Sequence, residues 1–162
     1  MRSNCILVLL VAFMDGCVTQ GRDASPLSLR DQQRAVALDW VLHHAADLQS
    51  QKTFCVTVHG QYLSDPTEQP SAALLAPYRS ASARVVPSAH CRRAEARPGV
   101  LTEVPRDTVW VSVGGVLDVS DSTAVVDAGL WTGPLAAEQY RCRIVRRGSR
   151  WYPFDCYLAG VS

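Results

Sequence analysis

Three side chains of this sequence could perform acid–base chemistry: those of Asp127, His44 and Tyr140. Asp127 interrupts the otherwise apolar segment "TAVVDAGLWTG", and a carboxylate on the inner face of a curved sheet could act as a general base. The alternative is that this face of the sheet meets solvent, with Val125 and Trp131 beside Asp127. We favour the alternative, because the spacing of residues identifies no partner acid, base or nucleophile.

The histidines add little to this chemistry. His44 falls on the apolar stripe of a predicted helix, so we interpret it as a packed side chain. A metal site on a helix needs two ligands on one face, whereas the neighbours His43 and His44 diverge by about 100°. The sequence contains no phosphate-binding loop, dinucleotide fingerprint or zinc-protease motif. We therefore expect no metal, no cofactor, and a binding module rather than an enzyme.

The cysteines predict disulfide bonds. Cys5 belongs to the N-terminal signal. If Cys17 is the lipid site, an even number of cysteines remains: Cys55, Cys91, Cys142 and Cys156. Four cysteines allow three connectivities, and neighbours in the sequence favour Cys55–Cys91 and Cys142–Cys156. A zinc site would need clustered ligands such as Cys-x-x-Cys, which the sequence lacks.

The first residues, "MRSNCILVLLVAFMDGC", predict export. A positive charge at Arg2 precedes an apolar run that is too short for the roughly 20 residues of a membrane span. Gly16 before Cys17 resembles a bacterial lipoprotein signal, with Cys17 as the lipid site; an ordinary secretory peptide is the alternative. We expect a signal at 1–16, a flexible tether at 17–27 and one globular domain at 28–162, in the bacterial envelope or periplasm and anchored to the bilayer.

The rest of the chain predicts one helix followed by strands. Residues 28–49 form an amphipathic pattern that Ser28 can cap, and 54–58 alternate as a strand does. A short helix near 71–77 and a short strand before Cys91 follow. From residue 100 onward the chain alternates as a meander of about four strands, in which Gly114-Gly115 permits a bulge. A net charge of +1 predicts no nucleic-acid partner.

The segment "CRIVRRGSRWYPFDC" predicts a stapled hairpin. A three-residue turn at 148–150 sets Cys142 opposite Cys156 and gives the hairpin one apolar and one wet face. The wet face is also our candidate surface for binding a partner. Its predicted residues are Arg141, Arg143, Arg147, Trp151 and Tyr157.

This order of elements predicts an α+β domain in which a long N-terminal helix packs on a curved antiparallel sheet of about four to five strands. The order over 28–158 resembles cystatin-like folds and the nuclear-transport-factor-like cone fold, and the pattern around the first two mature cysteines resembles uncharacterised exported bacterial proteins. We therefore expect an envelope module that binds a protein or a glycan. The alternative is a small-molecule-binding or hydrolytic enzyme of the cone-fold type, using Asp127, His44 or Tyr140.

Overall fold

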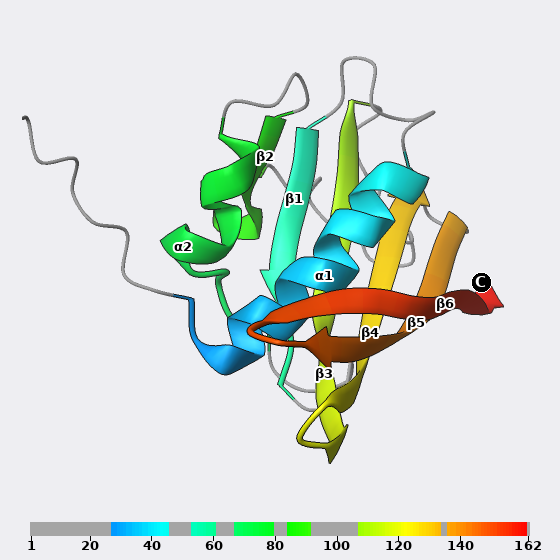
Figure 1. Cartoon of the computed structure of the whole chain (residues 1–162). Coiled ribbons are helices and arrows are strands. Elements are labelled where there is room, and N and C mark those ends of the chain that lie inside the picture. The colour runs from blue at the N-terminus through cyan, green and yellow to red at the C-terminus, as the bar shows by residue number, and fades with distance from the viewer. Residues whose placement is uncertain are drawn as a thin grey trace, which may run out of the picture.

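A computed structural model describes residues 27–45, 53–60, 67–79, 84–91, 107–133 and 136–161. The predicted signal and most of the predicted tether, including Cys17, lie outside these residues. The elements are α1 (Leu29–His44), β1 (Thr53–Val58), α2 (Ala72–Leu75), β2 (Arg84–Pro87), β3 (Thr108–Ser120), β4 (Thr123–Gly133), β5 (Ala136–Arg147) and β6 (Arg150–Val161), with short 3-10 turns η2 (Ala76–Tyr78) and η3 (Ser88–His90) (Figure 1).

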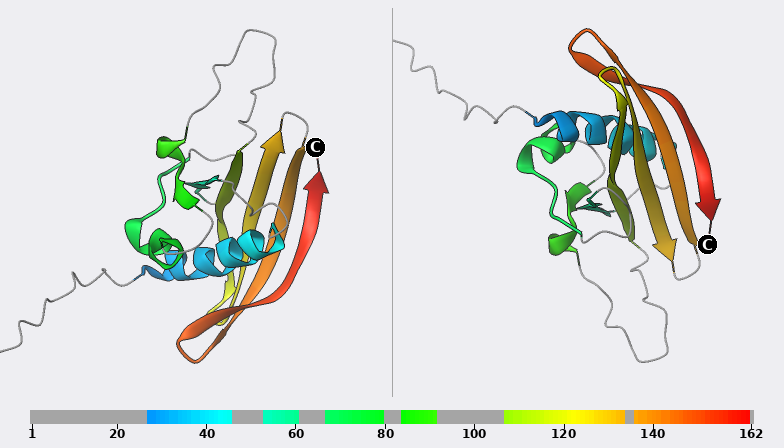
Figure 2. Two further views of the ribbon diagram at one scale, coloured as in Figure 1. Left: turned by 90° about the horizontal axis from the view of Figure 1, so that it is seen from above. Right: turned by 90° about the horizontal axis from the view of Figure 1, so that it is seen from below.

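The strands form one six-stranded sheet in the order β2-β1-β3-β4-β5-β6. β1 pairs in parallel with both β2 and β3, whereas β3 to β6 pair antiparallel with their neighbours. One helix, α1, packs on this mixed sheet, and the long β5–β6 hairpin bends around it (Figure 2). The general α+β class is as expected.

The expectation of an antiparallel sheet of about four to five strands is wrong. The sheet has six strands, and three of them are parallel. The reason lies between β1 and β2, where α2 carries the chain across so that β2 returns beside β1 in the same direction. β1 is buried on both faces, as parallel strands usually are. The alternation of its residues gave no information about its direction, because parallel and antiparallel strands alternate in the same way.

α1 begins as the sequence predicts, with Ser28 at its N-cap position. The Ser28 hydroxyl accepts a hydrogen bond from the Asp31 backbone N–H (3.1 Å), which satisfies one of the free donors of the first turn. Leu29 is 51% exposed, while the side chains that face the sheet are Gln33, Ala37, Leu38, Val41 and Leu42. The predicted extension to residue 49 lies outside the described residues.

Gly114 and Gly115 produce the bulge that the sequence permits. The register of β3 against β4 shifts between Gly114 and Leu117, and Gly115 has φ 60°. A side chain at Gly115 would strain this left-handed backbone, so glycine is needed there. The bulge lies directly beyond the end of β1, where the Gly115 N–H donates to the Gly60 carbonyl (2.8 Å).

Both predicted disulfides are present. Cys55–Cys91 ties β1 to the turn that follows β2, and Cys142–Cys156 joins directly opposed residues of β5 and β6. The Cα atoms are 6.1 Å apart in the first pair and 4.0 Å apart in the second. In the part of the chain that is described, no helix is long and apolar enough to cross a membrane.

The hairpin register is correct near the disulfide and wrong near the turn. Tyr140 lies opposite Leu158 and Arg143 opposite Asp155, as predicted. The turn has two residues rather than three, which sets Arg147 opposite Arg150. A register shift beyond Arg143 compensates for the shorter turn, with Phe154 as the extra residue.

This change in register moves Trp151 off the wet face. Trp151 lies opposite Arg146 instead of Arg147, and it is only 8% exposed within the hydrophobic core. Its predicted place beside Arg143 and Arg147 is therefore wrong, because a slip of one residue reverses the face on which a side chain lies. β6 is one of the two edge strands of the sheet, where Pro153 is tolerated although it has no backbone N–H to donate.

Candidate functional site

The face of the sheet turned away from α1, here called the outer face, carries most of the candidate polar residues. Its side chains follow from the strand register as rows that run across the sheet. One row contains Trp110 of β3 and Trp131 of β4, which are direct cross-strand partners. The next row contains Thr57, Ser112, Gly129, Gln139 and Gly160, contributed in turn by β1, β3, β4, β5 and β6.

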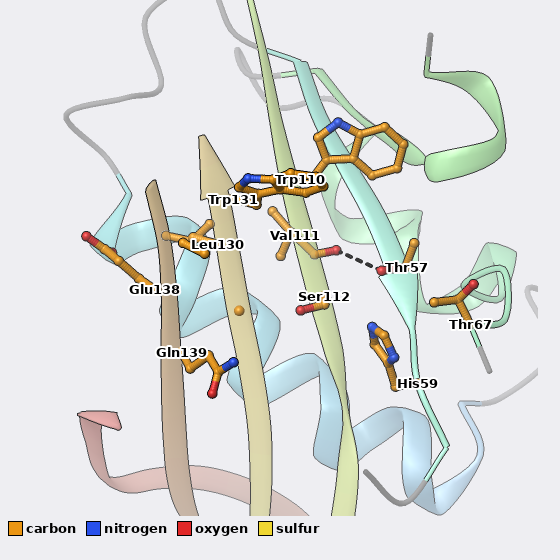
Figure 3. A pocket seen from close by; sticks show the side chains of 12 residues that line it. Thr57, His59, Thr67, Trp110, Val111, Ser112, Leu130, Trp131, Glu138 and Gln139 are labelled. Carbon is orange, nitrogen blue, oxygen red and sulfur yellow. Dashed lines mark hydrogen bonds between the residues drawn. The ribbon is translucent and has the colours of Figure 1, made fainter. Parts of the chain in front are cut away.

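A cavity of about 350 Å³ lies over these two rows. We call it the outer groove and define it by Thr57, His59, Trp110, Ser112, Gly129, Trp131 and Gln139. Figure 3 shows the two indole rings at one end, His59 and Gln139 toward the other, and α1 behind the sheet. The groove thus combines an aromatic wall with a polar floor and a polar far end.

The two tryptophans form the apolar wall, and both are half-buried. The Trp131 indole N–H donates to the Gly133 carbonyl on its own strand. Because this polar edge is already bonded, Trp131 has mainly its ring surface to offer to a ligand. The two side chains belong to directly opposed residues, so the backbone ladder fixes the separation of the points from which they extend.

The floor of the groove is low because Gly129 has no side chain. A Cβ at Gly129 would lie 2.7 Å from Ser112 Oγ, so any other residue would fill this space. The Thr57 hydroxyl donates to the Val111 carbonyl (3.4 Å), which leaves its lone pairs available as acceptors. Ser112 and Gln139 add a hydroxyl and an amide, each able both to donate and to accept.

His59 is positioned by α1 and by β3 together. Its backbone N–H donates to the Val113 carbonyl (2.9 Å), and its own carbonyl accepts from the Arg34 guanidinium (2.9 Å). A Cβ at Gly114 would lie 2.5 Å from the Cβ of His59, so glycine allows this close approach. The backbone of His59 is therefore fixed, and its imidazole extends from the end of the groove farthest from the tryptophans.

Glu138 borders the groove but turns its carboxylate away from it (Figure 3). That carboxylate accepts a hydrogen bond from the Tyr140 hydroxyl on the other face of the sheet. Burial raises the pKa of the Tyr140 hydroxyl, and the bond to Glu138 raises it further. Glu138 and Tyr140 thus form a hydrogen bond on the α1 side of the sheet and add no polar group to the groove.

The three candidate acid–base residues lie on opposite faces of the sheet. Asp127 lies on the outer face, where its carboxylate accepts from Arg141 Nε (2.8 Å) across the β4–β5 ladder. This hydrogen bond is the main cause that raises the pKa of Arg141. His44 and Tyr140 lie on the α1 side instead, with ring centroids 5.4 Å apart. The solvent-facing interpretation of Asp127 fits this arrangement better than the catalytic one.

The ring of His44 packs against neighbouring rings, but the residue is not buried. Its ring stacks on Trp40 at 4.8 Å, yet the residue as a whole is exposed at the end of α1. Trp40 also meets Tyr140 edge-on at 5.2 Å. The three rings form a cluster that ties the last turns of α1 to β5.

Part of the predicted partner-binding surface lies beside the outer groove. Arg141, Arg143 and Tyr157 are exposed on the outer face, with Arg141 opposite Tyr157. Arg147 is exposed at the hairpin turn, farther along the same strand pair. Because Gln139 and Arg141 occupy the same face of β5, the groove and this arginine surface are continuous.

Sequence reasoning missed Trp110 and His59 as members of a site, although it placed Trp131 on the correct face. The usable signal was alternation. In "TVWVSVGG" the valines face α1, so Trp110 and Ser112 must face outward. The signal was incomplete, because only the register of β3 against β4 brings Trp110 to Trp131.

A second cavity, of about 520 Å³, lies on the α1 side of the molecule. We call it the helix-side pocket. It is lined by Ala35, Val36, Asp39, Trp40 and His43 of α1, by Pro77 and Tyr78 of η2, and by Trp151, Tyr152 and Pro153 of β6. Three elements that are distant in the sequence thus contribute to it.

Within the described ranges, no group of three or more His, Cys, Asp or Glu side chains is arranged to hold a metal ion. The fold and the cavities define a disulfide-bonded α+β domain with a tryptophan-lined groove on one face of its sheet. Comparison of the chain with protein-family models, with curated proteins and with solved structures gives no match.

Proposed function

We propose that this protein is an exported, non-catalytic binding module that holds a glycan in the outer groove. The proposal rests on one observation, the cross-strand pair of indole rings of Trp110 and Trp131 above a polar floor. A sugar ring has C–H faces that stack on aromatic rings and a rim of hydroxyl groups that need donors and acceptors. The groove offers both kinds of contact within one cavity.

The polar groups of the groove favour a neutral, hydroxyl-rich ligand. Ser112 and Gln139 can each donate and accept, and the His59 ring and the Thr57 hydroxyl are further polar groups in the lining. The nearby carboxylate of Asp127 is already paired with Arg141 and so contributes little net charge. Thr57, Ser112 and Gln139 carry no charge that would attract a strongly charged ligand.

The size and surroundings of the groove suit a short oligosaccharide. Its volume of about 350 Å³ is at the small end of the range for ligand pockets, which suggests room for one or two sugar rings. A longer chain would continue over Arg141 and Tyr157, which belong to the partner-binding surface expected from the sequence. Arginine and tyrosine supply donors and an apolar ring for such an extension.

Export to the bacterial envelope, with a lipid anchor at Cys17, is part of the proposal. The two disulfides support it, because disulfides persist in oxidising compartments such as the periplasm. The alternative of a cone-fold enzyme receives less support, because Asp127 lies on the opposite face of the sheet from His44 and Tyr140. Catalysis would need these groups to converge.

The proposal can be tested by screening the mature domain on a glycan array and measuring the affinity of each hit by calorimetry. Replacing Trp131 with Ala should weaken binding by about tenfold or more, because the stacking surface is lost. Gly129→Ala should also weaken binding, since its Cβ would occupy the floor beside Ser112. Trp40→Phe, in the helix-side pocket, is the matched control and should bind as the unmodified protein does.

Two results would contradict the proposal. One is an array on which no glycan binds above background. The other is a hit whose affinity is unchanged by both Trp131→Ala and Gly129→Ala while circular dichroism shows the variants folded. In the second case the contact surface would lie elsewhere on the molecule.

A further inference from the structure

The helix-side pocket combines aromatic rings with one carboxylate. Trp40, Tyr78, Trp151 and Tyr152 supply the rings, and Asp39 is the acidic residue among the lining side chains. Asp39 and Trp40 lie near one another on α1, whereas the other rings come from η2 and β6. Positive charge is attracted both to the faces of aromatic rings and to a carboxylate, so the two kinds of lining group favour the same ligand charge.

The rings are held in place by contacts outside the cavity. The ring of His44 stacks on Trp40 at 4.8 Å, and Tyr140 meets Trp40 edge-on at 5.2 Å. Trp151 is 8% exposed and belongs to the hydrophobic core. A ligand would therefore meet rings that are already ordered, which lowers the entropic cost of binding.

Two side chains of the pocket lie next to the Asp39 carboxylate, those of Tyr78 and His43. The Tyr78 hydroxyl donates to Asp39 Oδ1 (3.4 Å). Burial is the largest cause that raises the pKa of Tyr78, followed by the charge of Asp39, so this hydroxyl remains a neutral donor. The His43 Nδ1 lies 3.5 Å from the same carboxylate oxygen and 2.7 Å from the backbone carbonyl oxygen of Asp39.

We propose that the helix-side pocket binds a quaternary ammonium group, such as the trimethylammonium head of choline or of a choline lipid. A primary ammonium would need acceptors for three N–H donors, and besides Asp39 the pocket side chains offer only an imidazole and phenolic hydroxyls. A trimethylammonium group has no donors, and its methyl groups pack on aromatic rings. This inference does not depend on the glycan proposal, because it concerns a different cavity.

The four tryptophans provide the measurement. Two line the helix-side pocket and two line the outer groove, so their indole N–H signals in a ¹H–¹⁵N spectrum report on the two cavities separately. Titration with tetramethylammonium and with choline should shift the signals of Trp40 and Trp151 and leave those of Trp110 and Trp131 unchanged. Single Trp→Phe variants assign the four signals.

Charge recognition is tested with a neutral isostere and a matched pair of variants. The alcohol 3,3-dimethylbutan-1-ol has the shape of choline without its charge, and it should bind about tenfold more weakly. Asp39→Asn should weaken choline binding by about threefold to tenfold, whereas Asp121→Asn, exposed in the β3–β4 turn, should not change it.

A vesicle assay distinguishes a free ligand from a lipid head group. Co-sedimentation with phosphatidylcholine vesicles but not with phosphatidylglycerol vesicles would assign the head group, and binding of choline alone would assign a soluble ligand. The proposal is overturned if neither choline nor tetramethylammonium shifts Trp40 and Trp151. It is equally overturned if the neutral alcohol binds as tightly as choline, or if Asp39→Asn has no effect.

Discussion

The outer groove and the helix-side pocket each contain two of the four tryptophans, but they are built in different ways. Most of the groove lies on one sheet, where the strand ladder fixes the distance from Trp110 to Trp131. The pocket is assembled from α1, η2 and β6, which meet through side chains. The groove therefore depends mainly on backbone hydrogen bonds, whereas the pocket depends on how well three separate elements pack.

This difference determines what the sequence must provide at each place. The groove needs small residues where backbones come close, as Gly114 and Gly129 show. The pocket needs large rings and a long helix face, which Val36, Trp40 and His43 supply at helical spacing. Each of the following changes should act mainly on one of the two regions, and so each can separate them.

The largest expected effect is on stability and comes from removing the disulfide beside the groove. Cys55–Cys91 has a sequence separation of 36 residues and Cys142–Cys156 one of 14. From the loop-closure entropy alone, replacing the first pair with Ala should lower the free energy of unfolding by about 4 kcal/mol, and the second by about 3 kcal/mol. Denaturant titration of both double variants measures the two losses.

The location of the loss should also differ between these two variants. Without Cys55–Cys91, hydrogen exchange should increase most in β1, which carries Thr57 of the groove. Without Cys142–Cys156 it should increase most in β5 and β6, which carry Trp151 of the pocket. The comparison fails if the hairpin variant loses more stability, or if both variants exchange in the same strands.

An intermediate effect is expected for Gly114→Ala. The new Cβ would lie 2.5 Å from the Cβ of His59 and 3.0 Å from its Cα, so backbone must move, at a cost of about 1–3 kcal/mol. Gly129→Ala is the control, because its Cβ meets the Ser112 hydroxyl, which can rotate to another rotamer at a cost below about 1 kcal/mol. Thermal unfolding of both variants measures the difference, and equal losses would show that the approach of His59 is not the tighter one.

The hairpin disulfide and the helix cap could be predicted from the sequence because each rests on local geometry. Cys142 and Cys156 face each other across a short hairpin, and Ser28 precedes its helix by one residue. The outward face of Asp127 and Trp131 was also predictable, since alternation alone decides it. These features need no knowledge of distant contacts.

Features that depend on distant pairing were not predictable. Alternation is the same for a parallel and an antiparallel strand, so nothing local gives the direction of β1 against β3. Trp151 was misplaced because one residue fewer in the turn changes the face of the side chains between the turn and the register shift at Phe154. The helix-side pocket needs α1, η2 and β6 together, and no single segment indicates it.

The smallest effect is expected in the helix-side pocket, for Tyr78→Phe. The lost hydrogen bond to Asp39 is 3.4 Å long and exposed, so the stability at pH 7 should change by less than about 1 kcal/mol.

The Tyr78→Phe variant should differ from the unmodified protein at alkaline pH. The pKa of Tyr78 is raised in the folded protein, so its contribution is present below the ordinary tyrosine pKa of about 10 and is lost as the pH rises above it. Denaturation between pH 8 and about 11 should therefore show a smaller decline for Tyr78→Phe than for the unmodified protein. Tyr152→Phe in the same pocket is the matched control and should decline as the unmodified protein does, because burial together with Asp39 favours the protonated form of Tyr78 in particular. Identical declines for all three proteins would mean that Tyr78 titrates as a solvent-exposed tyrosine, and that the pocket is more open than its packing suggests.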